Sequence, residues 1–192
     1  MLRLSFQGPT LSDLPVPDPA ASVRLLIPSP GTTELVIPVW NGNEFLLPGG
    51  ERPALRTFTP LNLDRATGRL DLEIVRHHGG VVSSWAEQAK PGAQAAISGP
   101  GRGYRISEDI SHVVLIGDET ALPAISQLLE ALPAQVTIDV HVEVVSEDAK
   151  LTLLAHQGRT LTWHVTDPGT SPGAHLVAVA ATIAEVDQST RI

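Results

Sequence analysis

The C-terminal half of the chain contains the stretch HVVLIGDETALPAISQLLEAL at residues 112–132, where an apolar run leads directly into an amphipathic one. The run His112–Ile116 is almost continuously apolar, which is typical of a strand that is buried on both faces of a parallel sheet. Across Glu119–Leu132 the large aliphatic residues recur at helical spacing. We therefore expect a buried strand followed by a helix.

The residues after this stretch continue the same pattern. Val136–Val145 is predicted to be a strand, Leu151–Ala155 a short helix and His175–Ala181 a third apolar strand. Strand, helix and strand of these lengths predict a βαβ unit and a parallel sheet. We therefore expect residues 107–192 to form a small, incomplete α/β domain of the nucleotide-binding type.

The N-terminal half has a different rhythm, with short apolar runs broken by proline and glycine. The runs expected to be strands are Ser22–Ile27, Glu34–Trp40, Glu44–Leu47, Leu70–Val75 and Ala93–Ile97. One helix is expected over Trp85–Ala89, capped by Ser83 or Ser84 and ended by Pro91. Many short strands with turn signals predict a small antiparallel β-barrel over residues 1–106.

The composition excludes several classes of protein. None of the 192 residues is cysteine, which rules out disulfides, thiolate nucleophiles, zinc fingers and cysteine-ligated iron–sulfur clusters. No apolar run is long enough to span a membrane. The N-terminus has no leader pattern, so a cytoplasmic protein is expected. A net charge of −8 argues against nucleic-acid binding, because neutralising phosphates needs a basic face.

The charge is unevenly distributed along the chain. Between Glu51 and Ile106 there are eight Lys and Arg and five Asp and Glu, so this segment has a net charge of +3. The remainder has five basic and sixteen acidic residues, a net charge of −11. An anionic ligand is therefore expected at the middle segment.

The first motif in this basic segment is Arg56-Thr57-Phe58-Thr59-Pro60. An arginine can hold a diphosphate with two hydrogen bonds, and an aromatic residue two positions later shares its face of a strand. Together with a threonine hydroxyl, this combination suits a flavin dinucleotide. The alternative is an ordinary barrel strand with a surface Arg56 and a core Phe58, and spacing alone favours that alternative.

The second motif runs from His77 to Ala86, where a strand end leads through Gly79 and Gly80 into the expected helix. Backbone N–H groups at a helix start, together with serine hydroxyls, can bind an anion. The alternative is a glycine turn with serine caps that only begin a helix. A metal site at His77 and His78 is not expected, because adjacent strand residues point to opposite faces.

The third motif is Gly117–Ala124, which directly follows the apolar strand and opens the helix. Open α/β sheets bind ligands at the carboxyl ends of their strands. The same residues are equally consistent with Thr120 as an N-cap and Pro123 in the first helical turn.

Taken in order, the motifs resemble the siderophore-interacting protein family, a branch of the ferredoxin-reductase-like flavoproteins. The series runs through Arg56–Pro60, a strand ending in Val75-Arg76-His77, the Ser-x-Trp-Ala of residues 83–86, ISGPG at 97–101 and LIGDETALPAI at 115–125. The resemblance extends from about Leu2 to the C-terminus. It implies an FAD-binding barrel, an NAD(P)H-binding domain and a role in reductive iron release from ferric siderophores.

The resemblance also assigns roles to individual residues. Arg56 and Thr59 would contact the flavin, Phe58 would stack on its ring, residues 80–83 would hold the diphosphate and residues 117–121 would border the nicotinamide. The cofactor-binding residues implied in this way are Arg56, Thr57, Phe58, Thr59, His77, Gly79, Gly80, Val81, Val82, Ser83, Trp85, Asp118, Thr120 and Ala121. No catalytic side chain and no metal ligand are implied.

The sequence departs from the family pattern at several places. Phe58 stands where the family usually has Tyr, and Val81-Val82 replaces the usual Pro-Ala in a loop one residue shorter. HLVAVAATIAEV at 175–186 occupies the place of a strand ending in Gly-Glu, so weak nicotinamide nucleotide binding is expected. The sequence also begins after the family's first barrel strand and ends before its last Arg-rich helix and aromatic tail.

Two functions from different classes are compatible with these residues. One is an FAD-dependent NAD(P)H oxidoreductase that reduces ferric siderophores, where an electron passes to iron(III) without a protein acid or base. The other is a flavin-binding or interaction module with little or no reductase activity, favoured by the missing Gly-Glu and the net charge of −8. A third outcome is that the loop changes abolish FAD binding and leave a folded remnant.

Overall fold

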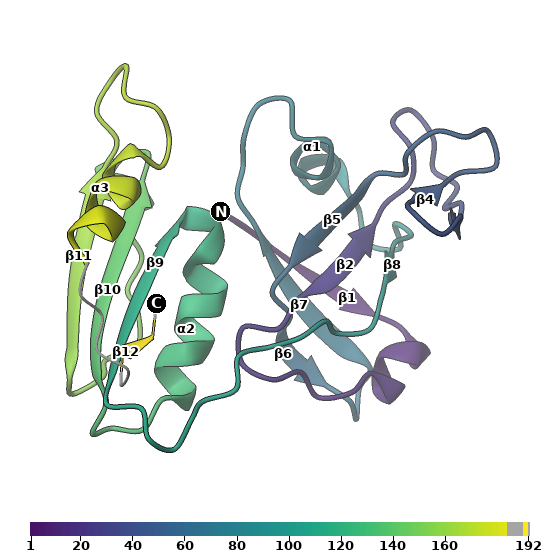
Figure 1. Cartoon of the computed structure of the whole chain (residues 1–192). Coiled ribbons are helices and arrows are strands. Elements are labelled where there is room, and N and C mark those ends of the chain that lie inside the picture. Colours follow the sequence, from purple (N-terminus) through teal and green to yellow (C-terminus); the bar gives the residue numbers. More distant parts are fainter. Residues whose placement is uncertain (184–189, 192) are drawn as a thin grey trace. The chain divides into compact units, whose positions relative to one another are not determined.

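The computed structural model describes residues 1–183 and 190–191 of the chain. These residues divide into two compact units, Met1–Gly103 and Tyr104–Ile192 (Figure 1). The first unit is built from antiparallel strands and one α-helix, and the second from a parallel sheet with helices.

The strands of the N-terminal unit pair as two sheets and a hairpin. The sheets are β1 (Leu2–Gln7), β7 (Arg69–Ile74) and β6 (Leu61–Asp64) in that order, and β5 (Leu55–Phe58), β2 (Val23–Leu26) and β8 (Ala96–Ile97) in that order; the hairpin is β3 (Val39–Trp40) with β4 (Phe45–Leu46). All these pairs are antiparallel, as the sequence predicts. Within the described residues the ladders stay separate, so closure into a complete barrel is not seen.

One apolar core joins the two sheets of this unit. Leu25 of β2 and Leu70 and Leu72 of β7 are fully buried, and helix α1 (Val81–Gln88) adds Val82 and Ala86. The short 3-10 helix η1 (Pro9–Asp13) contributes Leu11 to the same core. The apolar residues of the runs predicted to be strands therefore form much of the core of this unit.

Helix α1 begins before the serines that were expected to cap it. Its N-cap is Gly80, and Ser83 lies inside the helix with its side chain buried. The Ser83 hydroxyl accepts a hydrogen bond from the backbone N–H of His77 at 3.1 Å. Ser83 therefore ties the helix to the preceding strand end, and the first turn of α1 has no side-chain cap.

The C-terminal unit contains a parallel sheet in the order β11-β10-β9-β12. Its strands are β9 (His112–Asp118), β10 (Thr137–Val144), β11 (Arg159–Val165) and β12 (Thr190–Arg191). After β9, the 3-10 turn η2 (Glu119–Ala121) leads into helix α2 (Leu122–Ala131), which buries Ile125 and Leu129. Another 3-10 turn, η3 (Glu147–Ala149), follows β10. The strand and helix predicted over residues 112–132 are thus present.

Two predicted elements of this unit are wrong. Leu151–Ala155 has no helix, and His175–Ala181 lies in helix α3 (Ala174–Thr182) instead of a strand. A short continuous apolar run fits a strand or a helix equally well. Here the buried Glu143 carboxylate of β10 accepts hydrogen bonds from the N–H groups of Gly173 and His175, which stabilises the start of α3.

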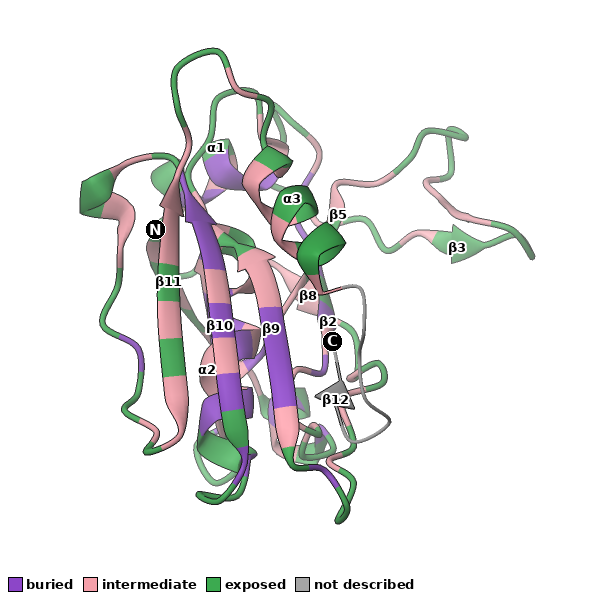
Figure 2. Ribbon diagram, turned by 60° about the vertical axis from the view of Figure 1, so that its left-hand side comes forward, coloured by how far each residue is buried: buried purple, intermediate pink, exposed green. Residues whose placement is uncertain are grey.

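The third parallel strand is instead β11, which the sequence analysis did not identify. Figure 2 shows buried residues in the middle of β9 and along β10, whereas α3 buries none of its residues. The expectation of weak nucleotide binding assumed that residues 180–182 end a strand. That assumption is wrong, because they end a helix, and residues 184–186 of the same stretch lie outside the described residues. In the described ranges no helix is long and apolar enough to cross a membrane.

Candidate functional site

Arg56 lies on the edge strand β5 and pairs with Leu25 of β2. Leu25 is completely buried, whereas Arg56 is exposed. Its guanidinium donates one hydrogen bond, 2.8 Å long, to the carbonyl oxygen of the neighbouring Leu55. Among the described residues no carboxylate forms an ion pair with Arg56, so its remaining N–H groups are available to an anion.

Phe58, two residues further along β5, pairs with the buried Val23. It is half-buried and packs against the core of the N-terminal unit. Phe58 therefore packs partly in the core, as the alternative for this motif expected, and its contact with a flavin stays a prediction. Its exposed remainder can still meet a ligand. Thr57 is exposed and Thr59 is half-buried just beyond the strand end.

The Gly/Ser loop brings three of the expected residues together at the start of α1. The exposed His77 lies against Gly80, where an added Cβ would stand 2.3 Å from the His77 Nε2 atom, and His77 also binds Ser83. Gly79 has φ +76°, a left-handed conformation that glycine adopts without strain. Because no side chain caps α1, its first backbone N–H groups remain available to an anion.

Three further loop residues differ in what they can offer a ligand. The Val82 side chain is part of the core, so only the backbone of Val82 is available to a ligand. Val81 is half-buried. Trp85 packs against the core and lines a groove that β1 forms with residues 89–97. No other expected site residue lines that groove in the described part of the chain.

In the C-terminal unit the expected residues form a tight turn at the carboxyl end of β9. Asp118 caps the 3-10 turn η2: its Oδ1 atom accepts hydrogen bonds from the Thr120 N–H at 2.8 Å and from the Thr120 hydroxyl at 2.6 Å. Thr120 is not the N-cap of α2 as expected, because that position is Ala121 and has no side-chain cap. Gly117 allows the strand to approach the helix closely, since a Cβ there would lie 2.4 Å from that of Ala121. This turn lies at a strand end, where α/β sheets bind nucleotides.

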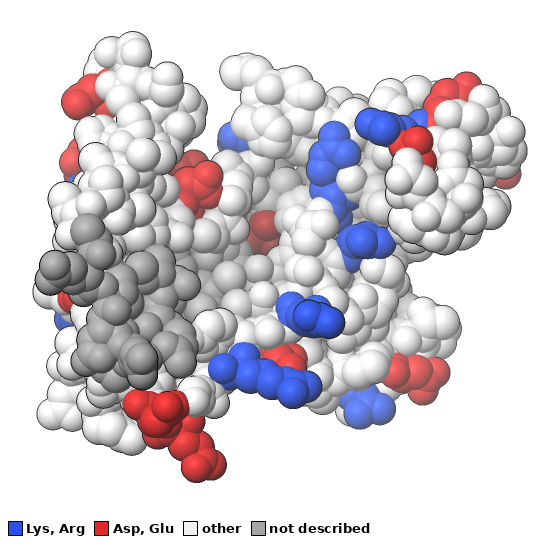
Figure 3. Space-filling view, viewed as in Figure 1, with Lys and Arg blue, Asp and Glu red and all other residues white. Residues whose placement is uncertain are grey.

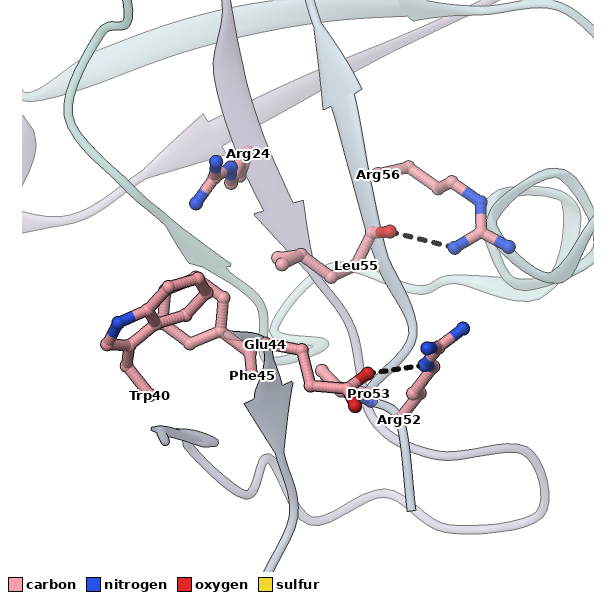
Figure 4. Close-up of a pocket in the computed structure, with 8 residues that line it drawn as sticks. All are labelled: Arg24, Trp40, Glu44, Phe45, Arg52, Pro53, Leu55 and Arg56. Atoms are coloured by element: carbon pink, nitrogen blue, oxygen red, sulfur yellow. Dashed lines mark hydrogen bonds and ion pairs between the residues drawn. The ribbon is translucent and has the colours of Figure 1, made fainter. Parts of the chain in front are cut away.

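A hollow of about 370 Å³ lies beside Arg56 in the N-terminal unit. It is lined by Arg24, Trp40, Glu44, Phe45, Arg52, Pro53, Leu55 and Arg56, which are drawn in Figure 4. The figure shows the Arg56 side chain extending away from the aromatic pair Trp40 and Phe45. Figure 3 shows Lys and Arg side chains spread over the visible face of the N-terminal unit, in agreement with the basic middle segment of the sequence.

Comparison with known proteins identifies the family. Residues 1–104 match the family model described as the siderophore-interacting FAD-binding domain, and residues 110–191 match the one described as siderophore-interacting protein. The chain belongs to the siderophore-interacting protein family. The resemblance found in the motifs is thereby confirmed, and so is the expected fold class.

Relatives within and near the siderophore-interacting family agree with this assignment. The structure of the siderophore-interacting protein SipS from Aeromonas hydrophila has a TM-score of 0.74 and 32% identity, and covers 98% of this chain and 74% of SipS. Ferric vibriobactin reductase ViuB from Vibrio cholerae is 27% identical over 88% of this chain and 62% of ViuB. The NADPH-dependent ferric-chelate reductase of Escherichia coli is 34% identical over 57% of this chain and 42% of the reductase.

The chain thus spans less than two thirds of the length of these curated relatives. More distant solved reductases, with 12% and 16% identity, share the fold alone. The N-terminal unit of this chain has residues that fit the diphosphate of FAD. Arg56 forms no ion pair among the described residues, and the start of α1 has no side-chain cap, so both can donate hydrogen bonds to phosphate.

A row of three histidines in the C-terminal unit was missed by the sequence analysis. His141 of β10 and His164 of β11 approach to 3.2 Å between Nδ1 and Nε2, and the rings of His164 and His175 stack with centroids 6.0 Å apart. Burial lowers the pKa of His164 below its ordinary value, and the charges of His141 and His175 lower it further, whereas Glu143 opposes the shift. No sequence motif signals this row, because its members come from three separate elements.

The histidine row predicts that the fold loses stability in mild acid. A lowered pKa means that the unfolded chain binds more protons than the folded one below about pH 6.5, so stability falls as the pH drops from there through the folded pKa. We expect the thermal midpoint of the wild type to fall more steeply than that of His164→Gln between pH about 7 and 5. His78→Gln, at an exposed loop histidine, is the control and should follow the wild type. Equal slopes for wild type and His164→Gln would contradict the prediction.

Proposed function

We propose that this chain is an FAD-dependent NAD(P)H oxidoreductase that reduces ferric siderophores and thereby releases iron. The observation that carries the proposal is that the N-terminal unit contains two groups able to bind an anion. Arg56 has no carboxylate partner among the described residues, and α1 begins at Gly80 without a side-chain cap. The match of residues 1–104 to a siderophore-interacting FAD-binding domain supports FAD as the anion.

Within this proposal the protein binds and orients the cofactor. The Arg56 guanidinium holds a phosphate with its free N–H groups, and the first N–H groups of α1 donate to the other phosphate. The exposed part of Phe58 covers one face of the ring, and Thr59 lies at the strand end beside it. His77, held against Gly80 and Ser83, fixes the shape of the loop around the diphosphate.

A bound flavin supplies chemistry that the side chains lack, since it takes two electrons from a nicotinamide and passes them on singly to iron(III). The chain then needs no general acid or base for the reduction. In this proposal residues 1–106 hold FAD and residues 107–192 receive NAD(P)H, with the turn at Asp118, Thr120 and Ala121 beside the nicotinamide. The names of ViuB and of the Escherichia coli reductase support a ferric siderophore as substrate. A cytoplasmic location remains part of the proposal.

The proposal is tested with the purified full chain reconstituted with FAD. After removal of free flavin, the protein should retain the visible absorption of FAD. Anaerobic mixing with NADPH or NADH should bleach that absorption, and addition of a ferric siderophore should restore it while a ferrous chelator records the iron released. A protein that retains FAD but is not bleached is the flavin-binding module instead. A protein that retains no FAD contradicts the proposal altogether.

A further inference from the structure

We infer that the hollow beside Arg56 binds the adenosine end of FAD, with Trp40 as the side chain that stacks on the adenine and distinguishes FAD from FMN. This inference rests on the proposed function, because it assumes that the diphosphate lies at Arg56. It goes beyond that function by assigning a role to the β3–β4 hairpin, which none of the expected site residues occupies.

The order of groups along β5 places adenosine at this hollow. In FAD the diphosphate stands between the flavin and the adenosine, so the two ring systems lie on opposite sides of it. Phe58, the expected flavin contact, lies two residues from Arg56 in one direction, about 7 Å along a strand. In the other direction the strand leads to Leu55 and Pro53, and both line the hollow. A dinucleotide that follows β5 therefore reaches the hollow with its adenosine.

The walls of the hollow suit a purine. The rings of Trp40 and Phe45 lie with centroids 4.9 Å apart at 57°, and Trp40 is 53% exposed, so a face of its indole is open. An aromatic face stacks on any nucleobase. The volume of about 370 Å³ lies within the range of pockets that take small ligands. Figure 4 shows Trp40 and Phe45 together on one side of the hollow, across from the strand that bears Arg56.

The hairpin that presents Trp40 is held in shape before any ligand binds. The Asn41 carboxamide oxygen accepts hydrogen bonds from the backbone N–H groups of Asn43 and Glu44, each 2.9 Å long, and closes the turn. Arg52 forms an ion pair of 2.6 Å with Glu44, which links the hairpin to the segment before β5. A preformed platform needs little ordering on binding, so the stacking energy is retained as affinity.

The charged residues that line the hollow favour an anionic ligand such as a nucleotide. Glu44 is the only acidic residue that lines the hollow in the described chain, and Arg52 neutralises it. Arg24 lies over the Phe45 ring, 5.5 Å from its centroid, and has no ion pair among the described residues. Arg24 and Arg56 therefore leave the hollow with a net positive charge beside an aromatic wall. An anionic substrate would find the same charge, so the experiment must separate the two occupants.

The test compares ligands that contain or lack adenosine. Dissociation constants for FAD, FMN and ADP are measured by fluorescence titration and calorimetry for wild type, Trp40→Ala and Trp40→Phe. We expect Trp40→Ala to weaken FAD and ADP binding about tenfold while FMN binding is unchanged, because base–aromatic stacking is lost only with adenine. Trp40→Phe should restore most of the affinity. Val39→Ala removes a 69% exposed neighbour that does not line the hollow, and it should behave as wild type.

Two results would overturn the inference while leaving the proposed function intact. One is FAD binding that is unchanged, or weakened together with FMN, in Trp40→Ala. The other is a raised KM for the ferric siderophore with unchanged FAD and ADP binding, which would make the hollow a substrate site. If the wild type binds no flavin at all, the proposed function fails, and ADP binding that depends on Trp40 would still support an adenosine site.

Discussion

Arg56→Ala should weaken FAD binding by ten- to a hundred-fold while leaving the fold intact. The side chain is exposed and its one hydrogen bond is to the adjacent Leu55 carbonyl, so its removal breaks no long-range contact. A charge-assisted hydrogen bond to a phosphate is worth about 1.5–3 kcal/mol, which corresponds to that loss of affinity. Flavin titration of the apoprotein, with urea unfolding beside it, measures both quantities.

Two companion variants make the Arg56 result specific. Arg65→Ala removes an exposed arginine of the same basic segment whose Nε atom donates to the Ser12 carbonyl oxygen, and it should leave FAD affinity unchanged. Arg56→Lys keeps the charge but loses the two-pronged geometry, so it should restore the affinity only in part. Equal flavin occupancy in Arg56→Ala and the wild type would remove Arg56 from the diphosphate site.

Phe58→Ala should lower both the stability of the N-terminal unit and its affinity for FAD. The ring is half-buried against the core, so truncation should cost about 1–3 kcal/mol of unfolding free energy, less than for a fully buried phenylalanine. Loss of stacking on the flavin should weaken FAD and FMN about tenfold. Urea unfolding of the apoprotein and flavin titration of its folded form separate the two effects.

Conservative replacements of Phe58 decide which of its two contacts matters for the cofactor. Phe58→Leu preserves apolar packing but offers no aromatic face, so it should retain most of the stability and lose flavin affinity. Phe58→Tyr provides the residue usual in the family and should bind flavin at least as tightly as the wild type. Unchanged flavin affinity in Phe58→Leu would mean that Phe58 is a core residue only.

Local sequence patterns were enough to identify the elements whose signals lie within one short segment. The stretch 112–132 specifies a strand and a helix because an apolar run and a helical repeat follow each other without interruption. Gly79 marks the turn into α1 because its left-handed φ disfavours larger residues, and Gly80 follows it as the N-cap of the helix. Arg56 could be singled out because its motif lies in the basic segment.

Tertiary contacts decided what these local signals left open. His175–Ala181 became a helix because Glu143, thirty-two residues before His175, provides acceptors for its first N–H groups. Phe58 packs partly against the core because strand pairing sets it beside the buried Val23 of β2. Neither partner is visible in the sequence around the residue that it controls.

The sequence by itself therefore determined the strand and helix of residues 112–132, the basic middle segment and the family, since each depends on neighbours along the chain. Only the tertiary structure placed Arg24, Trp40 and Phe45 around one hollow next to Arg56, and stacked three histidines from separate elements. The physical reason is that strand pairing and helix docking set these distances. Such pairings join residues far apart in sequence, and no periodicity or short motif predicts which distant side chains will be in contact.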